Sequence, residues 1–338
     1  MTESSGPLSA PPDPADAAEG GPPPIATFSL EGRAVPALYL IGWIGVVLGL
    51  GLVVMSLLAT GGSGAAWVFL IGLALLGLGL VAAAGSQAVE RGRRADLAYR
   101  GPAPVLVFAA VVSVVLVIVI VVLGPLSALG LDPGSPLATT LELALTAVVY
   151  IALIRLLVVG PGALSWTDMG LVMPAGVAVR DRGVGALLAV PVLLVTLLLG
   201  GVLSRVIEPG PSVLPAWGDA AGIVLNLISA AVIAPIGEEL FFRGFATTAW
   251  ARTIGARPAI ARGAAFFAAA HVLTLMDATF GAGVQHAAYA FATLLPAGLA
   301  LGWVYLSRRS LYAAIGLHAT FNALQVIALV VFASGAAT

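Results

Sequence analysis

Residues 103–127 read APVLVFAAVVSVVLVIVIVVLGPLS, a stretch without one charged side chain. About 20 consecutive apolar residues are enough for a helix to cross a bilayer. In lipid every backbone N–H and C=O must find a partner within the protein, so such a run forms a helix. This stretch therefore predicts a transmembrane helix, and the pattern recurs along the chain.

Composition extends this interpretation to the whole protein. Of 338 residues, 60% are apolar and 9% are charged, whereas about 25% are charged in a soluble domain. The apolar runs are 36–59, 66–88, 103–127, 138–160, 183–203, 220–243, 263–276, 285–306 and 311–333. We predict an all-α polytopic membrane protein with about 8–9 transmembrane helices; the short seventh run is a tilted crossing, part of a longer helix, or no full crossing.

Residues 1–33 differ from the rest of the chain. Prolines recur from Pro7 to Pro24, among Gly, Ser, Ala and scattered acidic residues. Such a segment cannot bury enough apolar surface to offset its ordering entropy. We predict a disordered Pro/Ala/Gly-rich tail at 1–33, N-terminal transmembrane helices over 34–130, and a second helical region over 138–335.

The arginines predict the orientation. All 15 basic residues are Arg, and 11 of them fall in alternate connections between the runs, against Arg205 alone in the others. An excess of basic residues marks cytoplasmic loops, so we expect a cytoplasmic N-terminus in a cell membrane, which the Arg-only, Ala/Gly-rich composition suggests is bacterial. A net charge of −1 gives no reason to expect a nucleic-acid partner, and the absence of Cys excludes thiol catalysis and Cys-ligated metals.

Three polar clusters lie inside the later runs, where ionisable residues are costly and mark function. They are Glu238-Glu239-x-x-x-Arg243, Phe267-x-x-x-His271 and His318-x-x-x-Asn322. Glu239 and Arg243 are four residues apart, so they share a helix face and can pair, while Glu238 points elsewhere. Counted from the nearest Arg, Glu238 and both histidines share one depth of roughly 8–14 Å at 1.5 Å per residue. We therefore expect one site near the cytoplasmic face.

Two chemistries fit these residues. Glu238, His271 and His318 are candidate ligands of a divalent metal such as zinc. Equally, Glu and His can activate a water without a metal, while a His and Asn322 donate to the oxyanion of a tetrahedral intermediate. Both arrangements suit hydrolysis of an amide.

At these residues the sequence resembles the intramembrane CAAX-processing and bacteriocin-processing proteases, the abortive-infection or type II CAAX endopeptidase family. All three motifs are present in order, and the resemblance covers roughly residues 140–335. It implies that 138–335 is an intramembrane protease domain in which Glu238 activates water, His271 holds that water or a metal, and His318 and Asn322 stabilise the oxyanion. Glu239 and Arg243 would orient the site.

The resemblance implies a peptide or membrane-protein substrate within the lipid bilayer. Two other functions remain alternatives: a catalytically inactive membrane scaffold or immunity protein, and a proton-coupled transporter that uses the same residues as a relay. A relay would spread ionisable groups across the membrane depth, whereas here they cluster.

Overall fold

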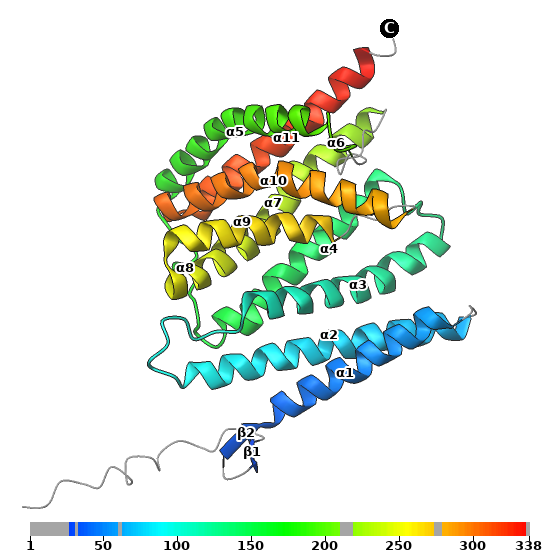
Figure 1. The fold of residues 1–338 in the computed structure, drawn as a ribbon, viewed down its shortest axis with the longest axis vertical. Coiled ribbons are helices and arrows are strands. Elements are labelled where there is room, and N and C mark those ends of the chain that lie inside the picture. The colour runs from blue at the N-terminus through cyan, green and yellow to red at the C-terminus, as the bar shows by residue number, and fades with distance from the viewer. Residues whose placement is uncertain (1–26, 31–32, 60–62, 210–218, 274–278, 336–338) are drawn as a thin grey trace, which may run out of the picture.

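The computed structural model describes residues 27–30, 33–59, 63–209, 219–273 and 279–335. Within these residues eight helices are long and apolar enough to cross a membrane, which confirms the all-α membrane fold (Figure 1). They are α1 (Ala37–Leu58), α2 (Ser63–Gly92), α3 (Pro104–Ala128), α4 (Pro136–Ile154) with its π-helical extension η2 (Arg155–Val159), α5 (Ala175–Leu203), a composite helix over 220–254, α10 (Phe280–Arg308) and α11 (Leu311–Gly335).

The composite helix alternates α and π turns. Its parts are α6 (Ala220–Ile228), η3 (Ser229–Ile233), α7 (Ala234–Glu239), η4 (Leu240–Thr247) and α8 (Thr248–Ile254). π turns are rare and are frequent at functional sites. Where η4 meets α8, the hydroxyls of Thr247 and Thr248 donate to the carbonyls five residues earlier, those of Phe242 and Arg243, at 2.8 and 3.3 Å.

The predicted end of this run at residue 243 is wrong. The helix continues to Ile254, and Arg243 is buried rather than placed at a membrane border. An arginine paired with a carboxylate on its own helix can remain inside a protein, so it gives the same sequence signal as an arginine at the border.

The short seventh run belongs to α9 (Ala256–Val272), which begins well before the predicted start at 263. Gly255, with φ +85°, ends α8 and lets the chain reverse. Arg257 and Arg262, which we placed in a connection, lie in α9 because arginine is a good helix former. Figure 1 shows α9 running back alongside α10.

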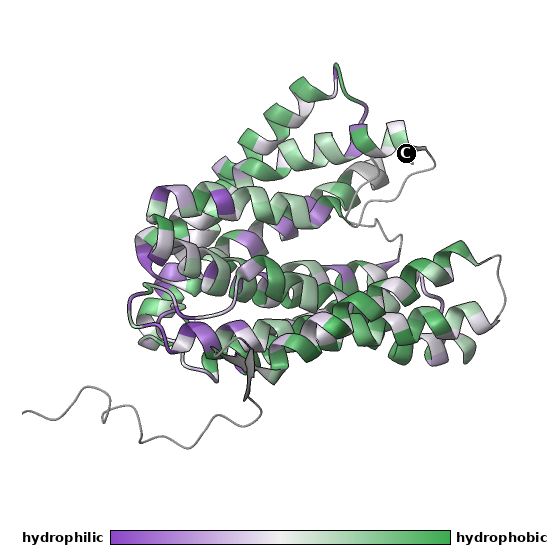
Figure 2. Cartoon of the chain, turned by 60° about the horizontal axis from the view of Figure 1, so that its bottom comes forward, coloured by the Kyte–Doolittle hydropathy of each residue, from purple (hydrophilic) through white to green (hydrophobic). Residues whose placement is uncertain are grey.

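The membrane-spanning helices begin and end at two opposite ends of the bundle. The connections after α2, η2, α8 and α10 gather at one end of the bundle, on the left in Figure 1, and the arginine clusters lie in these connections or in the helix turns next to them. We call this the Arg-rich end and the opposite one the Arg-poor end. Figure 2 shows hydrophilic residues concentrated at the Arg-rich end and hydrophobic residues along the helices.

Small residues let the helices approach closely. A Cβ on Gly72 would lie 2.9 Å from the backbone N of Val53, and one on Gly77 would meet a methyl group of Val114 at 3.3 Å. Glycine therefore lets α2 approach α1 on one face and α3 on another.

A short β-hairpin lies where the predicted tail meets α1. β1 (Thr27–Leu30) and β2 (Arg33–Pro36) pair as an antiparallel hairpin (Figure 1). The sequence Glu31-Gly32 separates two short segments with β-branched and aromatic residues, a pattern typical of hairpins. Residues 1–26 of the predicted tail lie outside the described residues.

Candidate active site

Three helices bring the predicted acid and both histidines together. Glu238 lies near the end of α7, His271 on α9 and His318 on α11. The distance from Glu238 Oε2 to His271 Nε2 is 3.6 Å, and to His318 Nε2 it is 4.0 Å. Both exceed a direct hydrogen bond, and each is short enough for one water to reach both groups.

The second glutamate forms a buried ion-pair network. Glu239 Oε1 accepts from Arg243 Nη1 at 2.9 Å and lies 2.7 Å from His318 Nδ1. The side chains of Glu239 and Arg243 are 0% and 1% exposed. A buried carboxylate without a partner is very costly, so this acid needs both contacts. The network holds the imidazole of His318 with its other nitrogen facing Glu238.

His271 is oriented by its own helix. Its Nδ1 lies 2.8 Å from the carbonyl oxygen of Phe267, one turn earlier. A carbonyl only accepts, so Nδ1 carries the proton, and a neutral His271 has its lone pair on Nε2, towards Glu238. Glu238 Oε2 is buried and has no hydrogen-bond partner among the described residues. The pair thus offers two acceptors to a donor placed between them.

Phe267 is the common wall of the site. Its ring lies 4.3 Å from the ring of His271 and 5.8 Å from that of His318, measured between centroids. The guanidinium carbon of Arg243 lies 4.2 Å from the same ring, a cation–π distance. The Phe-x-x-x-His motif therefore places an aromatic surface against both histidines and the buried cation.

Asn322 is held by a hydrogen bond to a backbone carbonyl that the π turn of the composite helix leaves without a backbone donor. Its Nδ2 donates to the carbonyl of Ala230 at 2.8 Å. In η3 the N–H of Ala234 already donates to Ser229, and Pro235, five residues after Ala230, has no N–H. The carbonyl of Ala230 is therefore left for a side-chain donor. The amide of Asn322 keeps a second N–H for another acceptor.

A cavity of about 220 Å³ contains these groups. It is lined by Thr139, Leu143, Asn226, Ala230, Ala234, Glu238, Phe267, His271, Leu294, Ala297, Leu301, Leu317, His318, Phe321, Asn322 and Gln325. Thus all four predicted catalytic residues face one space, while Glu239 and Arg243 lie behind it.

Sequence reasoning missed three polar residues of this cavity: Thr139, Asn226 and Gln325. A signal for one of them was present. Gln325 follows His318 by seven residues, on the same helical face. An amide inside an apolar run at helical spacing from a catalytic residue indicates a lining position.

The described side chains do not form a ready metal site. No group of three or more His, Cys, Asp or Glu residues in the described part of the chain is placed to hold a metal ion. A zinc site needs its ligand atoms at about 2.0–2.2 Å from one point. At 3.6 and 4.0 Å from Glu238 Oε2, the two histidine nitrogens are near enough to hold either a water or a metal ion together with it.

Comparison with known proteins identifies the segment that carries this site. Residues 220–324 match a family model described as type II CAAX prenyl endopeptidase Rce1-like. This segment is similar to the Rce1-like family. No curated protein and no solved structure matched the chain. The Rce1-like segment runs from α6 into α11 and includes all six predicted site residues, so the resemblance is confirmed there.

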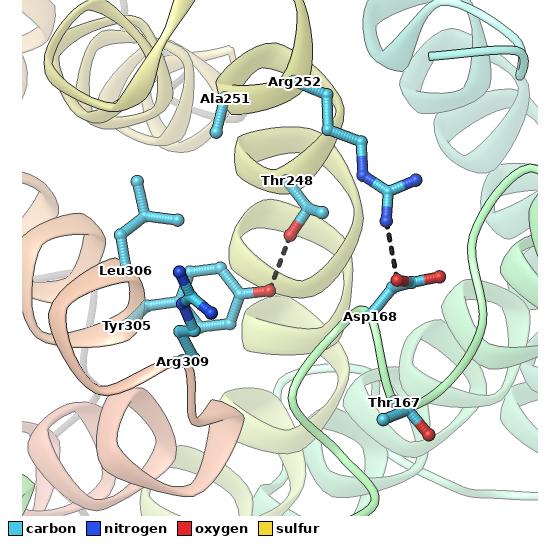
Figure 3. A pocket seen from close by; sticks show the side chains of 8 residues that line it. All are labelled: Thr167, Asp168, Thr248, Ala251, Arg252, Tyr305, Leu306 and Arg309. Atoms are coloured by element: carbon cyan, nitrogen blue, oxygen red, sulfur yellow. Dashed lines mark hydrogen bonds and ion pairs between the residues drawn. The ribbon is translucent and has the colours of Figure 1, made fainter. Parts of the chain in front are cut away.

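A second cavity, of about 450 Å³, lies at the Arg-rich end (Figure 3). One wall carries an ion pair of 2.6 Å between Arg252, in the Rce1-like segment, and Asp168, before α5. The other carries a 2.6 Å hydrogen bond between Thr248 and Tyr305. Burial opposes ionisation of Asp168, but hydrogen bonds from Ser165 and the charge of Arg252 outweigh it and lower its pKa.

The contacts of the segment before α5 give it a structural role. Gly170, with φ +69°, accepts a hydrogen bond from the N–H of Leu311 at 3.0 Å. A Cβ there would lie 2.8 Å from the carbonyl oxygen of Arg309. This loop therefore holds the corner between α10 and α11, and through it the start of the helix that carries His318.

Proposed function

We propose that this protein is an intramembrane endopeptidase in which Glu238 and His271 activate a water. The observation that carries the proposal is the convergence of two acceptors, Glu238 Oε2 and a neutral His271 Nε2, at 3.6 Å inside a cavity. A water between them can donate one hydrogen to each. Its oxygen is then held in place, with a lone pair free to attack a peptide carbonyl.

The reaction proceeds through a tetrahedral intermediate. As the water oxygen bonds to the carbonyl carbon, Glu238 takes a water proton and the carbonyl oxygen becomes an oxyanion. Glu238 then gives that proton to the peptide nitrogen as the C–N bond breaks, which leaves a carboxyl group and an amine. No covalent enzyme intermediate is needed, and the carboxylate is regenerated.

His318 and Asn322 are the donors to the oxyanion in this proposal. His318 acts as an imidazolium: Nδ1–H donates to Glu239, and Nε2–H is left for the substrate. In that state two carboxylates, Arg243 and His318 form an electrically neutral buried group, which low-dielectric surroundings favour. Asn322 adds its second amide hydrogen. Donors fixed before reaction stabilise an oxyanion by several kcal/mol, about 2.7–4 for a single donor.

Cleavage of a peptide library by the purified protein tests this function. Detergent-solubilised wild type, Glu238→Gln and Glu142→Gln are incubated with the library, and products are read by mass spectrometry. Glu142 is a matched control because it is an exposed glutamate on α4 outside the cavity. We expect identical cleavage by wild type and Glu142→Gln and none by Glu238→Gln. Equal cleavage by all three would refute the proposal.

A chelator arm on the same peptides tests the metal alternative. Activity that depends on Glu238 and survives chelation supports activation of water by the side chains alone. Activity that a chelator abolishes and zinc restores would assign Glu238, His271 and His318 to a metal instead.

A further inference from the structure

The cavity at the Arg-rich end contains a positive charge that no described acid compensates. Asp168 accepts from Arg252 at 2.6 Å, and its other oxygen accepts from the backbone N–H and the hydroxyl of Ser165, both at 2.8 Å. Arg309 also lines the cavity, and within the described part of the chain its guanidinium has no ion pair or hydrogen bond. Two arginines and one aspartate leave the lining with a net charge of +1.

The backbone of Arg309 adopts a conformation that favours glycine. Among the described residues it is the one non-glycine residue with a positive φ, at +50°. It directly follows α10, at a position where glycine is common. Glycine would meet this backbone requirement at lower cost, so what arginine adds at this corner is its side chain, which lines the cavity. Strained positions of this kind cluster at ligand sites.

The other walls supply hydroxyl groups and apolar surface. Thr248 and Tyr305 are hydrogen-bonded to each other at 2.6 Å, and in Figure 3 this bond lies between Arg309 on one side and the ion pair of Arg252 on the other. Guanidinium and hydroxyl groups are donors that proteins use to bind phosphate oxygens. At about 450 Å³ the cavity is within the range of ligand pockets, roughly 300–1,000 Å³.

An exposed apolar stripe leads from this cavity along α10. Leu306 lines the cavity, and Trp303 and Leu299 precede it by three and seven residues, on the same face of the helix. Trp303 and Leu299 are 55% and 43% exposed. In a membrane-spanning helix such side chains face lipid, and Trp is enriched at the boundary between acyl chains and headgroups. The stripe of Leu299, Trp303 and Leu306 therefore joins the cavity to the acyl-chain region.

We propose that this cavity binds the phosphodiester group of an anionic membrane lipid, with an acyl chain along the stripe. A phosphodiester carries one negative charge, which matches the net charge of the lining. The guanidinium of Arg309 can donate two parallel hydrogen bonds to its oxygens. Basic pockets between transmembrane helices are typical sites for anionic headgroups. Inorganic phosphate offers the same oxygens but no chain, and it would leave the stripe uncovered.

A lipid in this position contacts both helices that lead to the catalytic residues. Thr248 lies in α8, which continues the composite helix of Glu238, and Arg309 joins α10 to α11, the helix of His318. A ligand that binds only the folded protein stabilises it, so the bound lipid should raise the melting temperature. The two cavities share no lining residue, so this site does not depend on the proposed endopeptidase function.

Native mass spectrometry of the delipidated, detergent-solubilised protein counts bound lipid, and thermal melting measures its effect on stability. The lipid is dioctanoyl phosphatidylglycerol. Dioctanoylglycerol, which has the chains without the phosphate, and inorganic phosphate, which has no chains, are tested separately. Arg309→Gln removes the cation from the cavity. Arg93→Gln is the matched control, because Arg93 is exposed at the same end of the bundle and does not line the cavity.

We expect wild type and Arg93→Gln to bind phosphatidylglycerol equally and to melt at a higher temperature with it. Arg309→Gln should bind it about tenfold more weakly and lose most of that rise. Equal binding by Arg309→Gln and wild type, or an equal loss in Arg93→Gln, overturns the site. Inorganic phosphate or dioctanoylglycerol that stabilises wild type as much as the lipid does would overturn the assignment to a phospholipid.

Arg309→Gly separates lipid binding from folding. Glycine removes the guanidinium and relieves the left-handed backbone, so this variant should melt without lipid at least as high as wild type. It should gain little from phosphatidylglycerol. A rise as large as that of wild type would overturn the role of the Arg309 side chain. A lower melting temperature without lipid would contradict the argument from its backbone.

Discussion

Replacing Glu239 by Gln should destabilise the protein strongly although it hardly changes the shape of the side chain. Glu239 Oε1 is the acceptor for Arg243 at 2.9 Å and lies 2.7 Å from His318, with both ion-pair partners at most 1% exposed. Removing one partner of a buried pair leaves the other charge uncompensated, at a cost of about 3–5 kcal/mol. That corresponds to roughly a 10²- to 10⁴-fold shift in the unfolding equilibrium.

Denaturant titration of the detergent-solubilised protein measures this effect. The matched control is Asp96→Asn, which breaks an exposed pair with Arg94 outside the membrane-spanning helices and should leave stability unchanged. The double variant Glu239→Gln/Arg243→Met removes the uncompensated guanidinium and should recover much of the loss. It should still be inactive, because His318 has lost its carboxylate.

The result that refutes this reasoning is equal stability of Glu239→Gln and Asp96→Asn. A double variant no more stable than Glu239→Gln would also contradict it, because the loss would then not come from the uncompensated charge of Arg243.

Three further variants follow from the geometry. Gly237→Ala should lower the free energy of unfolding by about 1–3 kcal/mol, because the added Cβ would lie 2.9 Å from the Cα of Ala147. An unchanged melting temperature would contradict the close approach of α4 and α7. Asn322→Leu should lower kcat by about 10²–10³-fold and change KM less. A rise in KM as large as the fall in kcat would indicate that Asn322 has a structural role only. The lowered pKa of Asp168 means that its ion pair stabilises the protein above the ordinary carboxyl pKa, and that this is lost as pH falls through the lowered value; Asp168→Asn should abolish that part of the acid sensitivity, measured by melting at a series of pH values.

The helices and the catalytic cluster were predictable because each depends on local spacing. Apolar runs of fixed length specify crossings, and residues four apart share a face whatever surrounds them. That is why His318 and Asn322, or Glu239 and Arg243, could be paired from the sequence alone. Their convergence across three helices was predicted from a shared depth counted from the nearest Arg, although for Glu238 that count began at Arg243, which is buried.

The burial of Arg243 and the contacts around the site were not predictable, because they depend on residues distant in the sequence. In the sequence Arg243 looks like an arginine at a membrane border, but its ion pair with the Glu239 carboxylate keeps it inside the protein. Phe241 and Phe245 are fully buried next to the site, and their packing against rings from other helices has no counterpart in local spacing. The bond from Asn322 to Ala230 likewise required the π turn of η3, for which the sequence contains no periodic signal.

Turnover of one library-derived peptide by wild type and Glu238→Gln tests the central claim most directly. If Glu238 is the general base, kcat should fall by about 10²–10⁴-fold. The peptide should still bind with a similar KM or Kd, because the cavity walls are unchanged. Glu142→Gln should match wild type in both constants. A Glu238→Gln variant that keeps its kcat would contradict the claim that this carboxylate activates the attacking water.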